Sequence, residues 1–257
     1  MVSLLSPDHV MNLQLAKQSF PLCMRILHET LLRESHLRHG GRMQYGLFLK
    51  GLGLPLEEAM RFWQMSFSKK FSPEEFIKKY AYNIRHNYGK EGKRANYTPY
   101  SCQKIILGGS PGPGEFHGCP YKEWDVERLS AKLMSMGIGG NHREEIISKV
   151  RNKEYQLACR LEFEARHPEA TPGEVGNHPN AYAQESRQYF AEKNGEVKDS
   201  RNNTPSKNPA GSPMMTPPSV GKKHSVVTPS SSEPSEGQHA TPADVNTKRA
   251  RTDEEVI

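Results

Sequence analysis

The sequence predicts a mainly helical domain over about 190 residues, followed by a tail without a packed core. Two observations support this prediction. Apolar residues recur at helical spacing in several segments, and proline or capping residues stand where these segments begin. From Gly195 to Ile257 the chain has no Phe, Trp or Tyr and is dense in Pro, Ser, Thr and Gly, so this stretch cannot bury enough apolar surface to offset the entropy of ordering.

The first predicted helix spans about residues 21–35, after a lead-in at residues 1–20 with only a weak helical pattern. Pro21 suits the start of a helix, where its missing N–H is not needed. Cys23 falls in the first turn, where free backbone amides and the positive end of the helix dipole favour a thiolate. The same position suits a buried structural cysteine equally well.

The next helices are predicted at residues 55–68 and 72–79. The first has an apolar stripe and two glutamates in its first turn. Trp63 lies on that stripe, which favours a place in the core over a base-stacking role. The second helix begins with Ser72-Pro-Glu-Glu, which is a capping box. Residues 80–94 are then expected to form an exposed, basic and glycine-rich rim.

The second half of the domain is predicted to alternate helices with irregular loops. A loop at residues 108–118 holds five glycines and two prolines and leads directly into Cys119. Ordering such a loop costs entropy, which a metal–cysteine bond would offset. Further helices are predicted from a cap at Asp125, and at about residues 144–150, 154–166 and 182–190.

The formal net charge of +6 comes from one window, Arg38 to Lys104, which holds thirteen Lys and Arg against five Asp and Glu, together with twelve aromatic residues. Cations that neutralise phosphates, beside rings on which unpaired bases stack, are typical of a site for single-stranded or junction-shaped nucleic acid. A solvated basic face over an ordinary aromatic core explains the composition equally well. A glycine pair, Gly40 and Gly41, is expected to break the helix and to let backbone amides approach an anion, although such a pair is a weak signal.

Four cysteines, Cys23, Cys102, Cys119 and Cys159, are spread singly along the predicted domain. In a reducing compartment four thiols rarely form two disulfides. The paired C-x2-C spacing of a compact zinc site is absent. Spacing alone therefore leaves open whether the cysteines are independent core residues or meet at a metal.

Two classes of function are disfavoured by the sequence. The chain has no apolar run close to the length of a membrane span and no signal-peptide pattern at its start, so we expect an intracellular protein without membrane association. Nucleotidyl transfer generally needs closely placed carboxylates that hold two metal ions. The chain has five Asp, with no Asp-x-Asp and none in the basic window, and is therefore not expected to polymerise nucleotides alone.

The chain contains PLCMR from Pro21, HLRHGGRMQYGLFLKG from His36, YNIRH from Tyr82, YGKEGKR from Tyr88, YTPYSC from Tyr97 and HGCP from His117. Together these runs closely resemble the C-terminal domain of the eukaryotic DNA primase large subunit. The resemblance covers about residues 21–190, between the lead-in at 1–20 and a disordered tail at 191–257. It implies an all-α, compact iron–sulfur cluster domain with irregular loops, in which Cys23, Cys102, Cys119 and Cys159 hold a [4Fe-4S] cluster.

The resemblance also implies a function. Such domains belong to the non-catalytic, regulatory subunit of DNA primase, and they bind the junction between RNA primer and DNA template and grip the primer 5′-triphosphate. They support RNA primer synthesis by the primosome during DNA replication in the nucleus. The positions of this chain that match the nucleic-acid contacts of the family are His36, Arg38, His39, Arg42, Met43, Tyr45, Lys50, Trp63, Tyr80, Tyr82 and Asn83.

The partners that the resemblance implies are the DNA template, the RNA primer, the catalytic small subunit and DNA polymerase alpha. The family's N-terminal half, which docks on the small subunit, is not in the sequence. The chain is therefore expected to be a fragment, an isoform or a truncated paralogue, and stable docking on the small subunit stays open.

Two alternatives belong to other classes. One is an iron–sulfur DNA-processing enzyme, such as a nuclease or a photolyase-like protein, but the sequence lacks the carboxylate pair or flavin fingerprint that it would need. The other is an inert or regulatory fragment in which no cluster assembles. The tail itself carries Thr-Pro or Ser-Pro at Thr204, Ser212, Thr216, Thr228 and Thr241 and basic groups at Lys222 and Lys248. These predict proline-directed phosphorylation and a weak nuclear import signal, with an idle linker as the alternative.

Overall fold

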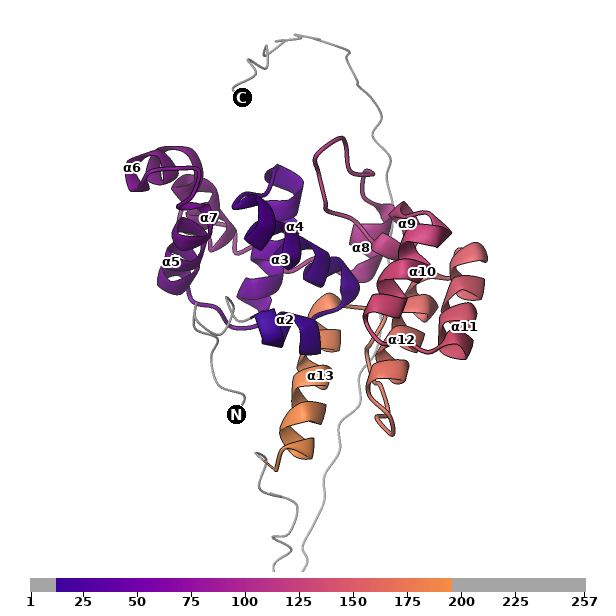
Figure 1. The fold of residues 1–257 in the computed structure, drawn as a ribbon. Helices are drawn as coiled ribbons and strands as arrows, with labels where there is room; N and C mark the ends of the chain where they lie inside the picture. Colours follow the sequence, from indigo (N-terminus) through magenta and orange to yellow (C-terminus); the bar gives the residue numbers. More distant parts are fainter. Residues whose placement is uncertain (1–12, 196–257) are drawn as a thin grey trace, which may run out of the picture. The chain divides into compact units, whose positions relative to one another are not determined.

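The computed structural model describes residues 13–195, where every regular element is a helix (Figure 1). Within this range the nearest approach to a strand is a single antiparallel bridge between Tyr88 and Asn96. The all-α prediction is therefore confirmed. The lead-in before residue 13 and the tail after residue 195, with its predicted phosphorylation and import motifs, lie outside the described residues. No helix in the described part is long and apolar enough to cross a membrane.

The described helices follow one another along the chain with short connections, except for the longer loops before α8, α9 and α13. They are α2 (Leu13–Ser19), α3 (Leu22–Glu34), α4 (His39–Gly51), α5 (Leu56–Phe67), α6 (Pro73–Phe76), the π-helical turn η1 (Ile77–Ala81), α7 (Tyr82–Asn87), α8 (Cys102–Leu107), α9 (Pro120–Glu123), α10 (Val126–Ser135), α11 (Gly140–Arg151), α12 (Tyr155–Arg166) and α13 (Pro179–Lys193).

Helices α2 to α7 pack around a core that is rich in aromatic rings. Trp63 of α5 lies at its centre and is only 3% exposed. Its ring meets Tyr45 edge to face at 6.2 Å and Phe67 at 5.5 Å between centroids. Edge-to-face contacts of this kind add to the roughly 2–3 kcal/mol that burying a large apolar side chain contributes. The amphipathic stripe of residues 55–68 thus faces the core, as predicted.

Helix α4 was not predicted, because a glycine pair usually interrupts a helix. Gly40 and Gly41 instead lie in its first turn. A Cβ on Gly40 would lie 2.6 Å from Nδ1 of His117, and one on Gly41 would lie 3.2 Å from Leu27. The glycines therefore permit close packing against a distant loop and a neighbouring helix, and the expected glycine turn is wrong.

The helix that was predicted to end near residue 79 continues to Asn87. Its capping box is formed as expected: the Ser72 amide donates to the Glu75 carboxylate at 3.0 Å, and the Glu75 amide donates to the Ser72 hydroxyl at 3.3 Å. Between α6 and α7 the π-helical turn η1 inserts an extra residue. The buried Phe76, Ala81 and Ile84 are consequently spaced five and then three residues apart, which hides the helical period in the sequence. The first part of the predicted rim, up to Asn87, is helical.

Helices α9 to α12, together with Leu22 and Ile26 of α3, build a second apolar cluster. Asp125 caps α10 as predicted, with the Arg128 amide donating to its carboxylate at 2.7 Å. The helix predicted at 144–150 is longer and begins at Gly140, whereas α12 follows its prediction closely. The helix expected at 182–190 begins earlier, at Pro179, and ends at Lys193.

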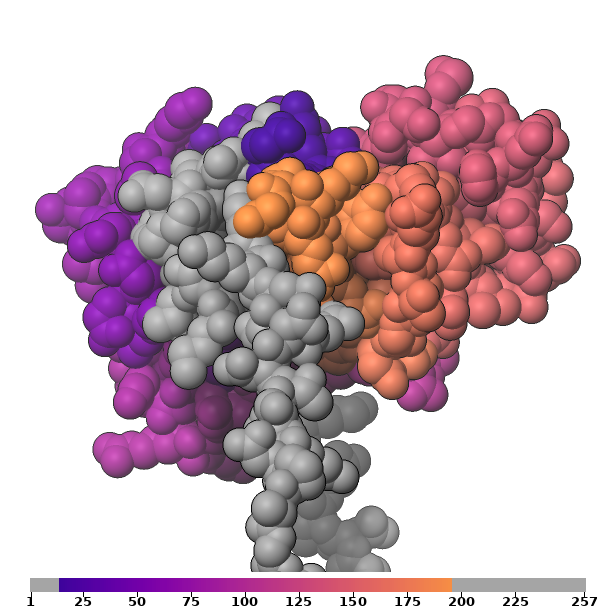
Figure 2. Space-filling model, turned by 90° about the horizontal axis from the view of Figure 1, so that it is seen from below, coloured from indigo at the N-terminus to yellow at the C-terminus, as the bar shows by residue number. Residues whose placement is uncertain are grey.

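Helix α13 packs against α2 and α4 and is tied to α12 (Figures 1 and 2). Arg166 of α12 donates to the Glu162 carboxylate at 3.1 Å and to the Tyr182 hydroxyl of α13 at 2.9 Å. The same guanidinium donates to the backbone carbonyls of Lys17 and Gln18 at the end of α2. Tyr182 completes the network by donating to Glu162 at 2.7 Å. One ion pair thus connects α12 and the following helix α13 to α2, which is far away in sequence.

Candidate functional site

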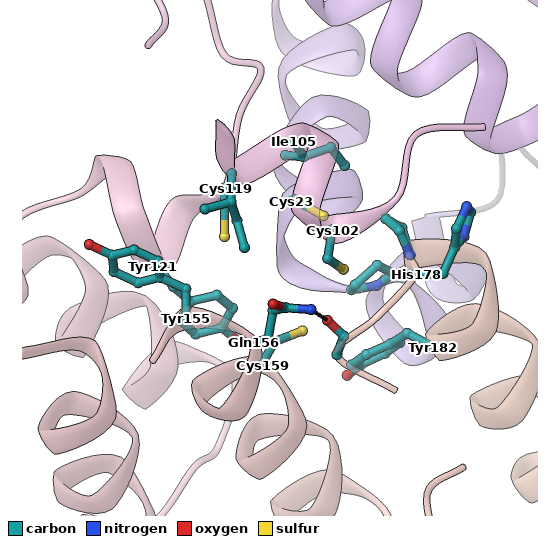
Figure 3. Close-up of a pocket in the computed structure, with 14 residues that line it drawn as sticks. Cys23, Cys102, Ile105, Cys119, Tyr121, Tyr155, Gln156, Cys159, His178 and Tyr182 are labelled. Carbon is teal, nitrogen blue, oxygen red and sulfur yellow. Dashed lines mark hydrogen bonds between the residues drawn. The ribbon is translucent and has the colours of Figure 1, made fainter. Parts of the chain in front are cut away.

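The four cysteines come from four different elements. Cys23 is the second residue of α3, Cys102 is the first residue of α8, Cys119 is the cap before α9, and Cys159 lies within α12. Figure 3 shows their sulfur atoms around one space, and all four side chains line the same pocket as free thiols. Folding therefore brings together the cysteines that sequence spacing left unassigned.

Local interactions hold two of the cysteine segments in place. The Ser101 hydroxyl caps α8, and the Cys102 amide donates to the carbonyl of Asn177 at 2.9 Å. The buried Gln44 of α4 makes two hydrogen bonds to Gly118, accepting from its amide at 2.8 Å and donating to its carbonyl at 3.2 Å. Because Gly118 directly precedes Cys119, Gln44 fixes the end of the glycine-rich loop where that thiol enters the pocket.

Burial and mutual repulsion raise the pKa values of the thiols. The pKa of Cys102 is raised to about 12 by burial and then by the charge of Cys119, whose own pKa burial raises to about 11. Burial raises the pKa values of Cys23 and Cys159 well above the ordinary range, and their neighbouring thiols add to the effect. The backbone amides of Tyr121 and Lys122 oppose the rise at Cys119. The dipole effect expected at Cys23 is thus outweighed by desolvation.

The four thiols share one pocket. It contains about 420 Å³ of space between its lining atoms, part of it at the open mouth, and is lined largely by apolar groups besides the four sulfurs. Among the described residues no three His, Cys, Asp or Glu side chains are placed to hold one metal ion.

A second group of functional side chains gathers at the start of α4. We call His36, Arg38, His39 and Arg42 the cationic cluster. Arg38 and His39 are exposed or partly exposed, and Arg42 is partly buried. Nη1 of Arg42 donates to the carbonyl of Leu37 at 2.7 Å, and its guanidinium lies 5.0 Å from the centre of the Tyr80 ring. The Nε of Arg42 has no hydrogen-bond partner in the described residues.

The two histidines of the cationic cluster have lowered pKa values. Burial, and then the nearby charges of Arg42, Lys70 and Arg38, lower the pKa of His36 to about 4. Burial and the charge of Arg42 also lower the pKa of His39. The lowered pKa values favour the neutral form of both rings in the free protein. An anion bound beside them would favour their protonated forms.

A small pocket adjoins the cationic cluster at His39. His39, Gly40 and Met43 form its α4 side. Lys104 of α8 and His117 of the glycine-rich loop form the opposite side. Sequence reasoning did not single out Lys104 or His117 as site residues. The short pattern HGCP contains His117 close to a cysteine, but only the fold reveals that the histidine packs on the first turn of α4.

Three of the residues that the resemblance assigned to nucleic-acid binding make packing contacts or hydrogen bonds within the domain. Tyr45 and Trp63 are 0% and 3% exposed, and the Tyr45 hydroxyl is bonded to Nδ1 of the buried His28 at 2.8 Å. Lys50 uses its three ammonium donors on the carbonyls of Asn87 and Tyr97 and on the side-chain oxygen of Asn96. Tyr45 and Trp63 are thus packed in the core and Lys50 is hydrogen-bonded within the domain, and their assignment to nucleic-acid binding stays a prediction.

Two of the remaining predicted contacts, Tyr80 and Asn83, lie beside the start of α4. The Tyr80 hydroxyl lies 3.1 Å from Nε2 of His36. The Asn83 amide points to the sulfur of Met43 at 3.7 Å, which joins α7 to α4. Tyr82 is 54% exposed. The structure therefore brings Tyr80 and Asn83 against the start of α4, whereas the ring of Tyr82 lies beside His86 of its own helix.

Comparisons with known proteins match most of the described chain. A family model for the C-terminal domain of the large subunit of eukaryotic and archaeal DNA primase matches residues 13–183. The chain is 54% identical over 181 residues to "Probable DNA primase large subunit" of Arabidopsis thaliana, and the match covers 70% of this chain and 39% of that protein.

Two further relatives match in the same way. "DNA primase large subunit" of Mus musculus is 51% identical over 174 residues, covering 67% of this chain and 34% of the relative. The protein of the same name from Saccharomyces cerevisiae is 42% identical over 178 residues, covering 66% of this chain and 34% of the relative. The chain thus spans little more than a third of the length of these curated relatives.

Proposed function

Because the chain belongs to the family formed by the C-terminal domain of the large subunit of eukaryotic and archaeal DNA primase, we propose that it binds the junction between an RNA primer and its DNA template as a non-catalytic component of primase. The observation that carries this proposal is the cationic cluster at the start of α4, flanked by the aromatic side chains of η1 and α7. Cations with adjacent rings are what a phosphorylated strand end beside unpaired bases requires.

The proposed ligand of the cationic cluster is the 5′-triphosphate of the primer. The amides in the first turn of α4 have no partner within the helix, and they lie at the positive end of the helix dipole. Arg38 can reach an anion there, and the guanidinium of Arg42 has an unpartnered Nε within the described residues. Arginine suits a triphosphate because its planar donors can bind two oxygens at once.

The neutral histidines add a pH dependence to this proposal. A triphosphate favours protonated His36 and His39, so binding takes up protons and affinity rises as the pH falls from 8 toward 6. The sign follows from the free-state pKa values, which lie below the ordinary value of 6.5 for both rings. A triphosphate affinity that is constant over this range would contradict a role for the two rings in phosphate binding.

We further propose that Cys23, Cys102, Cys119 and Cys159 hold a [4Fe-4S] cluster. When bound, such a cluster supplies four covalent links between distant segments and a one-electron redox centre. The chain's own contribution is to bring four thiols into one apolar pocket and to place backbone amides at Cys23 and Cys119. Because the free thiols have raised pKa values, loading releases protons from them.

The same family membership supports the proposed partners. The relatives are named as the large subunit of DNA primase, and we propose that catalysis belongs to the separate small subunit, with DNA polymerase alpha as a further partner in the nucleus. Since the chain matches only about a third of its relatives' length, docking on the small subunit is tested by co-purification of the two expressed together.

Junction binding is tested with two ligands that differ only at the primer end. The chain, purified anaerobically, is titrated with junctions that carry a 5′-triphosphate or a 5′-hydroxyl at matched salt. We expect the triphosphate to bind at least tenfold more tightly, because each charge-assisted hydrogen bond is worth about 1.5–3 kcal/mol. Arg38→Gln should reduce this preference, with Arg42→Ala as a second variant.

The matched control is Lys70→Gln, which removes an exposed charge near His36. It should weaken both junctions equally and only through the salt-dependent attraction. Equal affinity of the unmodified chain for the two junctions would overturn the proposed function. The cluster is tested separately by visible absorption and metal analysis: about four irons per chain are expected, and stoichiometric zinc without iron would refute it.

A further inference from the structure

We propose that Glu115 is an internal anion that opposes the binding of the primer triphosphate at the cationic cluster and so limits how tightly the primer end is held. Glu115 belongs to the glycine-rich loop, four residues before Cys119. The inference rests on the proposed junction binding and adds to that site a residue that lowers its affinity. A negative element of this kind is a recognised part of specific binding sites.

The glycine-rich loop lies against the residues that would hold the triphosphate. A Cβ on Gly114 would lie 3.5 Å from the guanidinium of Arg38. The ring of His117 packs on Gly40 in the first turn of α4. Glu115 lies between these two loop residues in sequence, so both of its flanks are held at the start of α4.

A tight turn fixes the position of the Glu115 carboxylate. The Glu115 amide donates to the carbonyl of Gly112 at 3.0 Å, and the Gly112 amide donates to the Glu115 carboxylate at 3.0 Å. Pro113 and Gly114 occupy the centre of the turn, and Gly114 has a φ of +74°. Proline followed by a glycine with positive φ is typical of a type II turn. The carboxylate is therefore ordered before a ligand arrives.

The carboxylate faces the first turn of α4 across one histidine ring. Its Oε2 lies 3.9 Å from Nδ1 of His117, and both side chains are partly buried. This Nδ1 has no hydrogen-bond partner in the described residues. It is also the atom nearest to a Cβ on Gly40, at 2.6 Å. The width of one ring thus separates the Glu115 carboxylate from the backbone amides that are proposed to bind phosphate.

Glu115 brings a negative charge to a site that is otherwise cationic. The charges that act on His36 are those of Arg42, Lys70 and Arg38. At His39, burial and then the charge of Arg42 lower the pKa, and the charge of Glu115 opposes them. A carboxylate that is near enough to act on His39 also repels an anion bound beside that ring. A triphosphate must therefore displace the carboxylate or bind against its repulsion.

The opposing charge affects the two kinds of primer end differently. A 5′-hydroxyl places no charge at α4, so Glu115 has little effect on it. A 5′-triphosphate places several negative charges there and is bound less tightly than the cations alone would allow. Because affinity differences at one interface lie mainly in the dissociation rate, the expected consequence is faster release of the triphosphate end.

The test uses Glu115→Gln, which removes the charge and keeps an oxygen that can accept from the Gly112 amide. The chain, purified anaerobically, is titrated at low and at high salt with junctions that carry a 5′-triphosphate or a 5′-hydroxyl. At low salt the variant should bind the triphosphate junction about three- to tenfold more tightly than the unmodified chain does, and the hydroxyl junction within about twofold. High salt should reduce the gain, since screening weakens the repulsion.

Glu145→Gln is the matched control, because Glu145 is an exposed carboxylate on α11 that lines neither the four-cysteine pocket nor the small pocket. It changes the net charge by the same amount and should affect the two junctions equally.

If the unmodified chain prefers the triphosphate but Glu115→Gln binds it no more tightly than Glu145→Gln does, the role of Glu115 is refuted and junction binding stands. If the unmodified chain has no preference for the triphosphate, the proposed function and this inference both fail. Weaker triphosphate binding by Glu115→Gln would show that the carboxylate assists the ligand. A gain that is as large at high salt would show an effect of loop structure, and either result would overturn the inference.

Discussion

Replacing Arg166 by methionine is expected to destabilise the helical domain by roughly 3–5 kcal/mol. The guanidinium makes hydrogen bonds to the Glu162 carboxylate at 3.1 Å and to the Tyr182 hydroxyl at 2.9 Å, and it donates to two carbonyls at the end of α2. Glu162 is 0% exposed. Methionine has an unbranched apolar side chain without a donor, so it would leave a buried carboxylate without its counter-charge.

The magnitude follows from what remains after the substitution. Truncating one partner of a buried pair costs much more than the net value of the pair, because the other charge stays desolvated. The Tyr182 hydroxyl still donates to Glu162 at 2.7 Å, which keeps the expected loss below that of a wholly isolated charge. Replacing both partners, Arg166→Met with Glu162→Met, should recover a substantial part of the loss, since an apolar pair leaves no uncompensated charge.

The assay is urea denaturation followed by circular dichroism, with all variants in the same metal-loaded state. The matched control is Arg160→Met on the same helix, where the pair with Glu164 spans 3.0 Å but the two side chains are 42% and 39% exposed. This control should lose no more than about 0.5 kcal/mol. Equal losses for Arg166→Met and Arg160→Met, or a double variant as unstable as Arg166→Met, would refute the reasoning.

Three further predictions concern single contacts. Gln44→Leu removes two buried hydrogen bonds to Gly118, so amide hydrogen exchange in the glycine-rich loop should speed up by the equivalent of about 1–3 kcal/mol. Unchanged exchange rates in this loop would show that Gln44 does not hold it in place. Burial lowers the pKa of His28 to about 4, so the neutral ring contributes fully to the free energy of unfolding above pH 6.5, and this contribution is lost as the pH falls. Between pH 7 and pH 5 the free energy of unfolding, measured by urea titration, should therefore fall by about 2 kcal/mol more for the unmodified chain than for His28→Leu. Lys50→Met should loosen the loop that carries Tyr97, seen as faster exchange there with little change at α12.

Local chemistry accounts for the parts of the fold that could be predicted. Caps act over three or four residues, so Ser72 and Asp125 marked the starts of their helices correctly. The stripe that holds Trp63 repeats at the helical period and therefore showed which face is buried. These signals depend on neighbours along the chain and need no tertiary contact to be interpreted.

Helix α4 was not predicted because it depends on a contact between residues that are far apart in sequence. Its glycines are explained by the ring of His117, which is far away in sequence and lies against Gly40. Without that contact a glycine pair has only its low helix propensity as a guide. The π-helical turn η1 escaped prediction in the same way, because the place where the period shifts is decided by packing of Phe76 and Ala81 against the core.

The basic and aromatic window illustrates what composition can and cannot distinguish. Its aromatic residues form two populations. Tyr45 and Trp63 are buried in the core, whereas Tyr82 and Tyr97 are exposed on the surface. Composition cannot tell these populations apart, and only burial separates them. The four cysteines were chosen from the resemblance, since nothing in their spacing brings them to one pocket.

The two proposed sites share their supporting elements. Cys102 begins α8, and Lys104 of the same helix lines the small pocket beside α4. Cys119 follows Gly118, which Gln44 of α4 clamps by two hydrogen bonds. Two of the segments that place a thiol in the four-cysteine pocket therefore also position a wall of the small pocket beside the cationic cluster. Because protein interiors are closely packed and transmit displacement, any group that draws the four thiols together must also fix the spacing between α4, α8 and the glycine-rich loop.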